Sequence, residues 1–314
     1  MATAEIKQRT ALESERRARL AVPALAGGFL YLLSAIILNA TLKELPTVGI
    51  AQGLEPALRG EANPTVSPRA AEVKFIDHHA FGLIAGSVLT AVAVLALMLV
   101  LLFLAECTRF RRPEAWPAAR PLVIVGAIGY AALNLIHEIA LAVEAHKFAH
   151  GSDFSNRAVE KALLGSGGVG VTLGLLGLLA ALALAVGMVA VAVGAMRAGL
   201  LARWLGMLGA VSGVLFLPFF GGGSSLIFDL IPAFWMVATG ILLIGRWPNG
   251  DPPAWAAGES RPWPTQAELR AQREGKANGA PTAAAQGVAA AEPAPAPTPA
   301  PGGGGGSRRK RRKR

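Results

Sequence analysis

Long runs without a charged side chain constrain the fold of this chain more than any other feature. Between Leu20 and Thr41 the sequence contains no Asp, Glu, Lys, Arg or His. An α-helix rises 1.5 Å per residue, so about 20 residues cross a hydrocarbon core that is about 30 Å thick. The run is also longer than the apolar part of a cleaved signal peptide. It therefore predicts a retained helix that spans a membrane.

Five further apolar runs follow, and together they predict an all-α polytopic membrane bundle with six transmembrane helices. The predicted spans cover residues 20–41, 80–105, 121–143, 166–196, 204–220 and 226–245, within a transmembrane domain from 20 to 246. The run 204–220 is the shortest, and a glycine-rich turn joins it to the last run. This final pair has an alternative interpretation as a re-entrant hairpin, which would leave the following segment on the same side of the membrane.

The net charge of +10 is explained by where Lys and Arg lie along the chain. In the six-span topology, 23 of the 30 basic residues fall on the side that carries the N-terminus, and 7 fall on the other side. Cytoplasmic segments retain Lys and Arg during membrane insertion. We therefore predict a multi-pass membrane protein with both termini in the cytoplasm.

The composition excludes other classes of protein. Hydrophobic residues make up 53% of the chain and charged residues 16%, which argues against intrinsic disorder for most of its length. The single cysteine cannot form a disulfide within its own chain, so a disulfide scaffold is excluded.

The segments outside the predicted spans differ in composition. Residues 1–19 form a charged cytoplasmic segment, and residues 42–79 form an outer loop with four prolines, for which we expect at most a short helical turn near Pro56. The juxtamembrane stretch 247–264 is rich in Pro and Trp, and its tryptophans are predicted to lie at the headgroup level. Residues 265–314 have the Ala, Pro and Gly content typical of a disordered cytoplasmic tail.

The tail closes with seven consecutive basic residues. Such a segment next to a membrane gains about 1 kcal/mol per basic residue from anionic lipid headgroups at the cytoplasmic face. Nucleic acid is another polyanion, but the tethered position favours lipid. The predicted lipid-binding residues are Arg308, Arg309, Lys310, Arg311, Arg312, Lys313 and Arg314.

Ionisable side chains within the predicted spans indicate a polar pocket. Asn134, His137 and Glu138 are spaced so that they share one helix face. Asp229 lies about one turn into the sixth span, and Asp77 precedes the second span. Because ionisable groups in a membrane face partners or a water-filled cavity, we expect an outward-facing pocket that binds a small ligand or a proton. The alternative is that headgroups, water or the side chains themselves satisfy these groups.

All five histidines fall on the predicted outer side, near several carboxylates. Imidazole and carboxylate suit zinc or iron, so a divalent metal is a candidate cofactor. A helix would place residues 146 and 150 on one face, but the sequence gives no third ligand at a defined spacing. The sequence has no HExxH, Walker A or GxSxG motif. The candidate ligands are His78, His79, His137, His146 and His150.

Glycines recur at helical spacing in two of the predicted spans. Small faces allow helices to approach closely, either within one bundle or between two copies of a chain. The spacing favours packing within the bundle, with a homodimer as the alternative. The glycines are Gly167, Gly170, Gly174 and Gly177 in one span and Gly206, Gly209 and Gly213 in the next.

Short features at the ends of the spans give the chain a family resemblance. They are Arg16, Arg17 and Arg19 before the first span, Asp77, His78 and His79 before the second, and Arg246, Trp247, Pro248, Pro252, Pro253, Ala254 and Trp255 after the last. Between about residues 15 and 265, the chain resembles a group of six-span bacterial integral membrane proteins of unknown function, common in high-GC actinobacteria. The resemblance implies a six-span bundle in a bacterial plasma (inner) membrane. It implies no particular reaction or cofactor.

Three classes of function are compatible with the sequence. The first, which we favour, is a membrane protein without enzymatic activity, a sensor or stress-related component with an outward-facing pocket. The second is a small-solute or proton-coupled transporter that uses His137, Glu138 and Asp229. The third is a metal-dependent membrane enzyme with its site at the outer face, built from histidines 78, 79 and 137 with a carboxylate.

Overall fold

The computed structural model describes most of the chain and divides it into two units. The described residues are 2–49, 51–52, 58–60, 66–165, 168–217, 226–248, 250–261, 263 and 270. The first unit is Met1–Trp263 and the second is Pro264–Arg314. In the second unit Arg270 alone is described, so the predicted lipid-binding residues 308–314 lie outside the described part.

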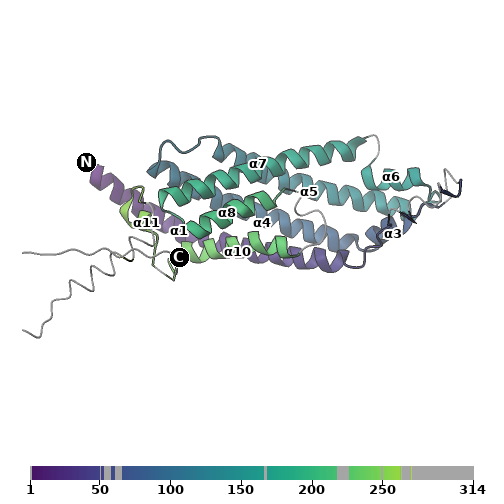
Figure 1. Cartoon of the computed structure of the whole chain (residues 1–314), viewed down its shortest axis with the longest axis horizontal. Helices are drawn as coiled ribbons and strands as arrows, with labels where there is room; N and C mark the ends of the chain where they lie inside the picture. The colour runs from purple at the N-terminus through teal and green to yellow at the C-terminus, as the bar shows by residue number, and fades with distance from the viewer. Residues whose placement is uncertain are drawn as a thin grey trace, which may run out of the picture. The chain divides into compact units, whose positions relative to one another are not determined.

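The described elements of the first unit are helices (Figure 1). They are α1 (Ala2–Leu42), α3 (Ala70–His78), α4 (Ala80–Arg111), α5 (Ala119–Ala149), α6 (Asn156–Leu164), α7 (Val169–Ala198), α8 (Arg203–Leu215), α10 (Leu226–Leu243) and α11 (Pro253–Ala257). The described residues of the predicted N-terminal segment 1–19 form the first part of α1.

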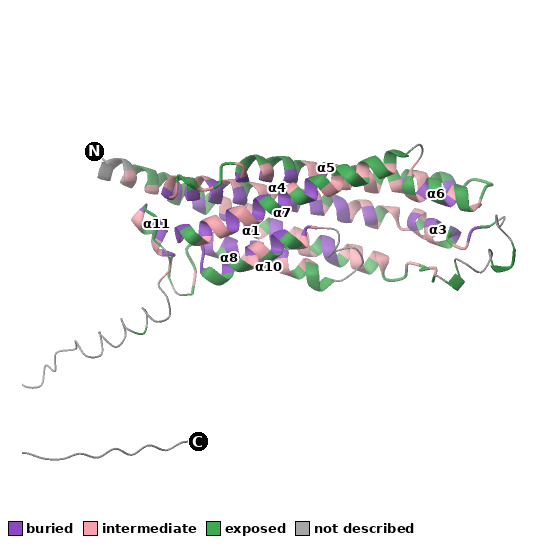
Figure 2. Ribbon diagram, turned by 45° about the horizontal axis from the view of Figure 1, so that its top comes forward, coloured by how far each residue is buried: buried purple, intermediate pink, exposed green. Residues whose placement is uncertain are grey.

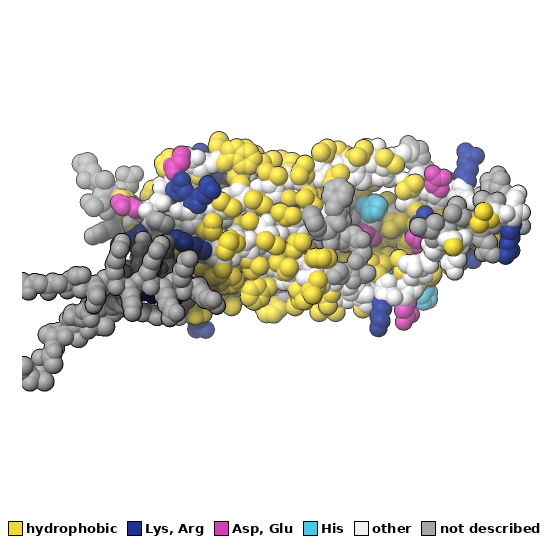
Figure 3. All heavy atoms as spheres, in the orientation of Figure 1, with side chains coloured by type: hydrophobic (Ala, Val, Ile, Leu, Met, Phe, Trp, Pro, Cys, Tyr) yellow, Lys and Arg dark blue, Asp and Glu magenta, His cyan; other side chains and the backbone are white. Residues whose placement is uncertain are grey.

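Five of these helices, α1, α4, α5, α7 and α10, are long and apolar enough to cross a membrane. Their outward faces carry large apolar side chains such as Phe29, Val125 and Leu179, each more than 60% exposed. Exposed residues run along these helices in Figure 2, and Figure 3 shows a broad apolar band with charged side chains at its two ends. Soluble proteins do not leave so large an apolar surface in water. The chain is therefore an integral membrane protein.

The predicted span 204–220 differs from the structure. Its helix, α8, has 13 residues, or a length of about 20 Å, which is too short to cross the hydrocarbon core. Pro218 follows in the sequence, and proline disfavours a helical backbone at the residue before it. Residues 218–220 of the predicted span lie outside the described part. The six-helix prediction is thus supported for five helices, and α8 is a shorter apolar helix.

The helices α8 and α10 occupy only one half of the bundle. Near its end, α8 packs Gly213 against Ala185, which lies near the middle of α7. At its start, α10 places Asp229 beside Tyr31, well before the end of α1. The described residues of this pair therefore lie in the half of the bundle that contains the start of α1. We call this half the N-terminal half. In the part of the chain that the structure describes, the other half, which we call the α3/α6 half, contains α1, α4, α5 and α7.

Small residues bring the long helices close together. At Gly126, where α5 meets α7, an added Cβ would lie 2.2 Å from the backbone nitrogen of Leu184. Between α1 and α4, the Ser34 hydroxyl donates to the Gly86 carbonyl at 2.7 Å, and the Ser34 and Thr90 hydroxyl oxygens are 2.6 Å apart. Close backbone approach and weakly polar contacts of this kind are typical of helix packing in membranes.

The two glycine faces predicted from the sequence differ in their surroundings. All three glycines of the α8 face pack against α7 or α10 of the same chain, so this face is used within the bundle. Gly174 and Gly177 of α7, in contrast, have no described neighbour within 4 Å of the place where a Cβ would lie. Gly167 lies outside the described residues. A homodimer through either face stays a prediction.

A cap formed by α3, α6 and the end of α5 covers the α3/α6 half. Its apolar cluster consists of Ala70, Val73, Ile76, Leu83, Ala145, Phe148, Val159 and Ala162. The backbone N–H of Ser67 donates to the Phe154 carbonyl at 2.7 Å and joins the segments that precede α3 and α6. The structure here differs from the irregular loop predicted for 42–79, because apolar residues recur at helical spacing after Pro68.

At the opposite end of the first unit, α11 packs into the N-terminal half. Trp255 of α11 is 7% exposed and donates its indole N–H to the Leu200 carbonyl at 3.0 Å. The guanidinium carbons of Arg17 and Arg111 lie 4.9 and 5.4 Å from the centroid of its ring. Trp255 is therefore a core residue of the N-terminal half, and its position at the headgroup level stays a prediction.

Candidate functional site: a cavity in the α3/α6 half

A cavity of about 470 Å³ lies in the α3/α6 half of the bundle. It extends along α1 from Tyr31 to Leu42, the last residue of that helix, and α4, α5, α7 and the end of α8 supply other walls. In Figure 3 the surface of this half is hollowed beside a histidine side chain. The polar residues that line the cavity are Tyr31, Ser34, Asn39, Thr90, Tyr130, Asn134, His137 and Asp229.

Two features of the sequence create this space. Among the described residues, α8 ends at Leu215 and α10 begins at Leu226, and both helices lie in the N-terminal half. On α7, Gly174 and Gly177 line the cavity without side chains, and a Cβ at either position would meet no described atom within 4 Å. A larger residue at either glycine would therefore project into the cavity instead of into a neighbouring helix.

Asp229 is the acidic group of the cavity. It lies in the first turn of α10, where the unpaired N–H groups of a helix favour a negative charge. The Tyr31 hydroxyl donates to its Oδ1 at 3.4 Å. The described residues that line the cavity include no Lys or Arg, and of them only His137 can carry a positive charge. The carboxylate thus has no permanent cationic partner among these residues.

Three aromatic rings line the same cavity as Asp229. Phe216 packs edge-to-face against Tyr31, with ring centroids 5.9 Å apart, and against Tyr130, with centroids 5.8 Å apart. The sequence contains two tyrosines, and both line this cavity. Because the faces of aromatic rings attract cations, the rings and the carboxylate favour the same kind of ligand.

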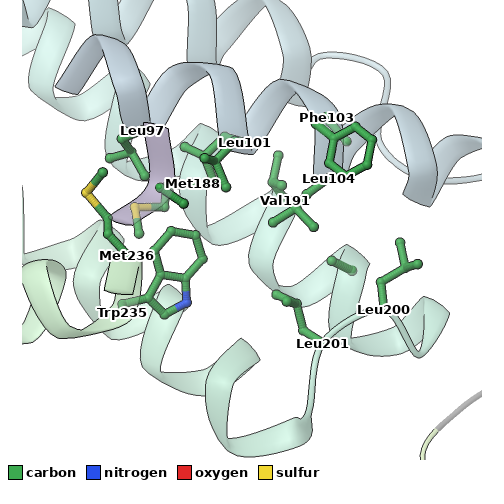
Figure 4. Packing of buried hydrophobic residues seen from close by; sticks show 14 of the residues in the cluster. Leu97, Leu101, Phe103, Leu104, Met188, Val191, Leu200, Leu201, Trp235 and Met236 are labelled. Carbon is green, nitrogen blue, oxygen red and sulfur yellow. The ribbon is translucent and has the colours of Figure 1, made fainter. Parts of the chain in front are cut away.

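Packed side chains close the cavity toward the N-terminal half. One turn beyond the lining residues Thr90 and Ala181, the side chains of Val94 and Leu184 are completely buried. Figure 4 shows the packing of apolar side chains around Trp235 in this half. The indole N–H of Trp235 donates to the Leu205 carbonyl at 2.9 Å. Among the described residues, the cavity therefore ends at this core.

The five residues predicted to form a pocket do not all line the same cavity. Those that line the cavity are Asn134, His137 and Asp229. Glu138 follows His137 on α5 but is not among the lining residues. Asp77 lies near the end of α3, with its Oδ1 2.9 Å from Nδ1 of His146, and belongs to the cap.

The five candidate metal ligands fall into three groups. His137 lines the cavity. His78 and His79 lie where α3 meets α4, with ring centroids 5.0 Å apart. His146 and His150 lie near the end of α5, with ring centroids 4.2 Å apart. Among the described residues, the group with metal-ligand spacing contains none of the first three histidines, and the outer-face enzyme site expected from them stays a prediction.

The three aromatic residues of the cavity were not among the predicted site residues. A signal was present for the tyrosines, because both lie well inside predicted spans, whereas tyrosine in membrane proteins is usually enriched at the membrane surface. Phe216 carries no such signal, since phenylalanine is common throughout apolar helices.

The fold and the cavity define the class of protein: a multi-pass helical membrane protein with a ligand-sized cavity in one half of its bundle. No protein family model, curated protein or solved structure matches the chain. Its function is therefore inferred from the geometry and chemistry of its own residues.

Proposed function

We propose that this integral membrane protein is a sensor that binds a small organic cation in the cavity. The observation that carries the proposal is the combination of Asp229 with three aromatic rings in a cavity whose described lining residues include no Lys or Arg. A carboxylate in a membrane protein is costly unless a cation or a proton compensates its charge. A substituted ammonium group compensates the charge and contacts aromatic faces at the same time.

The size and lining of the cavity suit a small amine. Its volume of about 470 Å³ falls within the range of roughly 300–1,000 Å³ that is usual for small-molecule sites. Leu133 and Leu173 provide apolar surface for alkyl groups, and Asn134 and His137 provide hydrogen-bonding groups on the α5 wall. A compact ammonium compound with one polar substituent, such as choline, has this combination of properties.

The packed end of the cavity favours a sensor over a transporter. A solute that reaches Val94 and Leu184 meets a closed core and leaves by the way it entered. One observation favours the transporter: α10 begins beside the cavity, and interrupted helices form the binding sites of many transporters. Choline uptake by vesicles that contain the purified protein separates the two functions, because a sensor binds the solute without net flux.

Removing the charge of Asp229 is expected to weaken the binding of choline. Loss of a desolvated charge pair costs at least roughly 2 kcal/mol, so Asp229→Asn should raise the dissociation constant by about 30-fold or more. Isothermal titration of the purified full chain in lipid nanodiscs measures the change. The neutral analogue 3,3-dimethylbutan-1-ol, which has the shape of choline without its charge, should bind weakly to the wild type and to the variant alike.

Two further variants make this test specific. Glu138→Gln removes a carboxylate that does not line the cavity, so it should leave the dissociation constant unchanged. Gly177→Leu adds a side chain to the cavity wall at a position where a Cβ would meet no described atom within 4 Å, so it should abolish binding in a folded protein. Equal affinity of Asp229→Asn and the wild type for choline would refute the cation site.

We further propose that both termini are cytoplasmic and that the bilayer is a bacterial plasma membrane. Basic residues that line one groove in the N-terminal half are Arg109, Arg112, Arg120 and Arg197. Arg16 adds to this basic end and lies 3.5 Å from Glu106. Such a concentration of arginine supports a cytoplasmic position for this end of the bundle. In this orientation, residues 308–314 would lie on the side of the membrane where they can bind anionic lipid headgroups.

Reporter fusions are expected to show this orientation. A reporter that is active only in the cytoplasm should be active when it is fused after Pro264. The same reporter inserted between α5 and α6, at residues 151–155, should be inactive, because that loop lies at the other end of the bundle. The reverse pattern would overturn the orientation, and activity at both sites would overturn the membrane topology.

A further inference from the structure

We propose that the cap binds a zinc ion through Asp77, His146 and His150. This site is separate from the cavity and does not depend on the proposed sensor function. It also differs from the ligand set expected from the sequence, because the structure supplies the third ligand, Asp77, from another helix. Each of the three side chains offers one metal-binding atom, and these atoms lie within 4.8 Å of one another.

The cap positions these side chains through two helices. His146 and His150 are one turn apart near the end of α5 and present their rings on the same face, with centroids 4.2 Å apart. Asp77 is the next-to-last residue of α3, and its Oδ1 lies 2.9 Å from Nδ1 of His146. The apolar cluster of the cap holds α3 against α5 beneath this group.

The hydrogen bonding of the group suits metal coordination. Nδ1 of His150 lies 3.1 Å from the backbone carbonyl of His146, so Nδ1–H donates to it in the tautomer that leaves Nε2 free as a ligand. Zinc-bound histidines generally have such a partner for the other ring nitrogen. Two imidazoles and a carboxylate with one open position are the ligand set of several zinc sites.

Metal binding requires the three ligand atoms to move closer together than their present separations of up to 4.8 Å. Bonds of about 2.0 Å in a tetrahedral arrangement place ligand atoms roughly 3.3 Å apart. The side chain of His146 is 66% exposed and His150 is also exposed, so both rings can turn without displacing the core. Imidazole ligands favour zinc over magnesium or calcium, which prefer oxygen ligands.

The neighbouring histidines provide a matched control within the same cap. His79 stacks on Phe75, with ring centroids 4.0 Å apart, and its Nδ1 lies 3.0 Å from the Phe75 carbonyl. His78 precedes it at the end of α3. Neither residue belongs to the group that converges with Asp77, although both lie close to it in the sequence.

A zinc ion at this position would link α3 to α5 and thereby fasten the cap to the bundle. Because a ligand that binds only the folded state stabilises that state, zinc should raise the unfolding temperature of the full chain. The test uses purified full-length protein without a histidine tag, freed of metal by a chelator and held at neutral pH.

Titration with zinc chloride should show one saturable site per chain and a rise in unfolding temperature. His150→Asn and Asp77→Asn should each weaken zinc binding by at least about tenfold and reduce the thermal shift. His78→Asn should bind as the wild type does. Asp77→Asn keeps the size of the side chain, so it tests the site even if a histidine variant misfolds. Magnesium chloride at the same concentration should not compete.

Three results would overturn the proposal. The first is the absence of saturable zinc binding to the wild type. The second is unchanged affinity in both His150→Asn and Asp77→Asn. The third is a loss of affinity in His78→Asn as large as that in His150→Asn, which would mean that zinc binds histidines of the cap without the proposed ligand set.

Discussion

Replacing Gly126 with alanine is expected to destabilise the bundle by about 3 kcal/mol or more. The new Cβ would lie 2.2 Å from the backbone nitrogen of Leu184 and 2.6 Å from its Cα, whereas carbon atoms pack best at about 3.5–4.0 Å. Overpacking typically costs roughly 1–3 kcal/mol where side chains can adjust. Here the obstacle is the backbone of α7, so α5 and α7 would have to move apart along their whole contact.

The matched control is Gly174→Ala on α7. An added Cβ at Gly174 meets no described atom within 4 Å, and alanine favours the helical conformation by up to about 1 kcal/mol relative to glycine. This variant should therefore be as stable as the wild type or slightly more stable. Thermal unfolding of the two purified variants in the same detergent measures the difference, and equal unfolding temperatures would contradict the close contact at Gly126.

The membrane-spanning helices were predictable because hydropathy is a local property of the sequence. A run such as Leu20–Thr41 is apolar whatever its neighbours are, and five of the predicted spans correspond to helices long enough to cross. The short length of α8 was less predictable, since Leu215 and the residues after it are as apolar as the helix itself. Where such a run stops being helical depends on its packing against α7 and α10, which hydropathy does not record.

The cavity was predictable only where a side chain is unusual for a membrane. Asn134, His137 and Asp229 are polar residues inside apolar runs, and all three line the cavity. Tyr31 and Tyr130 were missed because a tyrosine carries no charge and its position depends on the rotation of its helix. Asp77 does not line the cavity. Residues 42–79 were expected to form an irregular loop, whereas α3 brings Asp77 beside His146 of α5.

The buried arginines were missed for a different reason. Arg17 and Arg111 lie at the basic ends of predicted spans, and the retention of positive charge in the cytoplasm explains such residues without any tertiary contact. Their burial depends on α11, which follows the last span and packs Trp255 between the ends of other helices. A distribution of charges along the sequence does not distinguish an arginine that faces water from one that is enclosed.

Arg111→Ala is therefore expected to destabilise the protein by about 3–5 kcal/mol. The Arg111 side chain has no exposed surface, and its Nη2 lies 2.7 Å from Oε2 of Glu13, whose side chain is 10% exposed. Its remaining groups donate to the carbonyls of Ala254 and Cys107, each at 3.1 Å. Among the described residues, the substitution leaves the carboxylate of Glu13 with only Arg9, which is 44% exposed and whose Nε lies 4.0 Å from Oε1. It also removes a hydrogen bond between α4 and α11.

A neighbouring arginine separates this effect from the loss of a positive charge. Arg112 pairs with Glu114 at 2.8 Å, but the two side chains are 31% and 64% exposed, so Arg112→Ala should change stability by less than about 1 kcal/mol. The double variant Arg111→Met with Glu13→Leu should recover much of the loss, because apolar residues of similar volume often replace a buried ion pair at little cost. Thermal unfolding of all three variants in detergent tests the argument. If Arg111→Ala unfolds at the same temperature as Arg112→Ala, then the enclosed pair does not hold the N-terminal half together, and the role of Arg111 is limited to its positive charge.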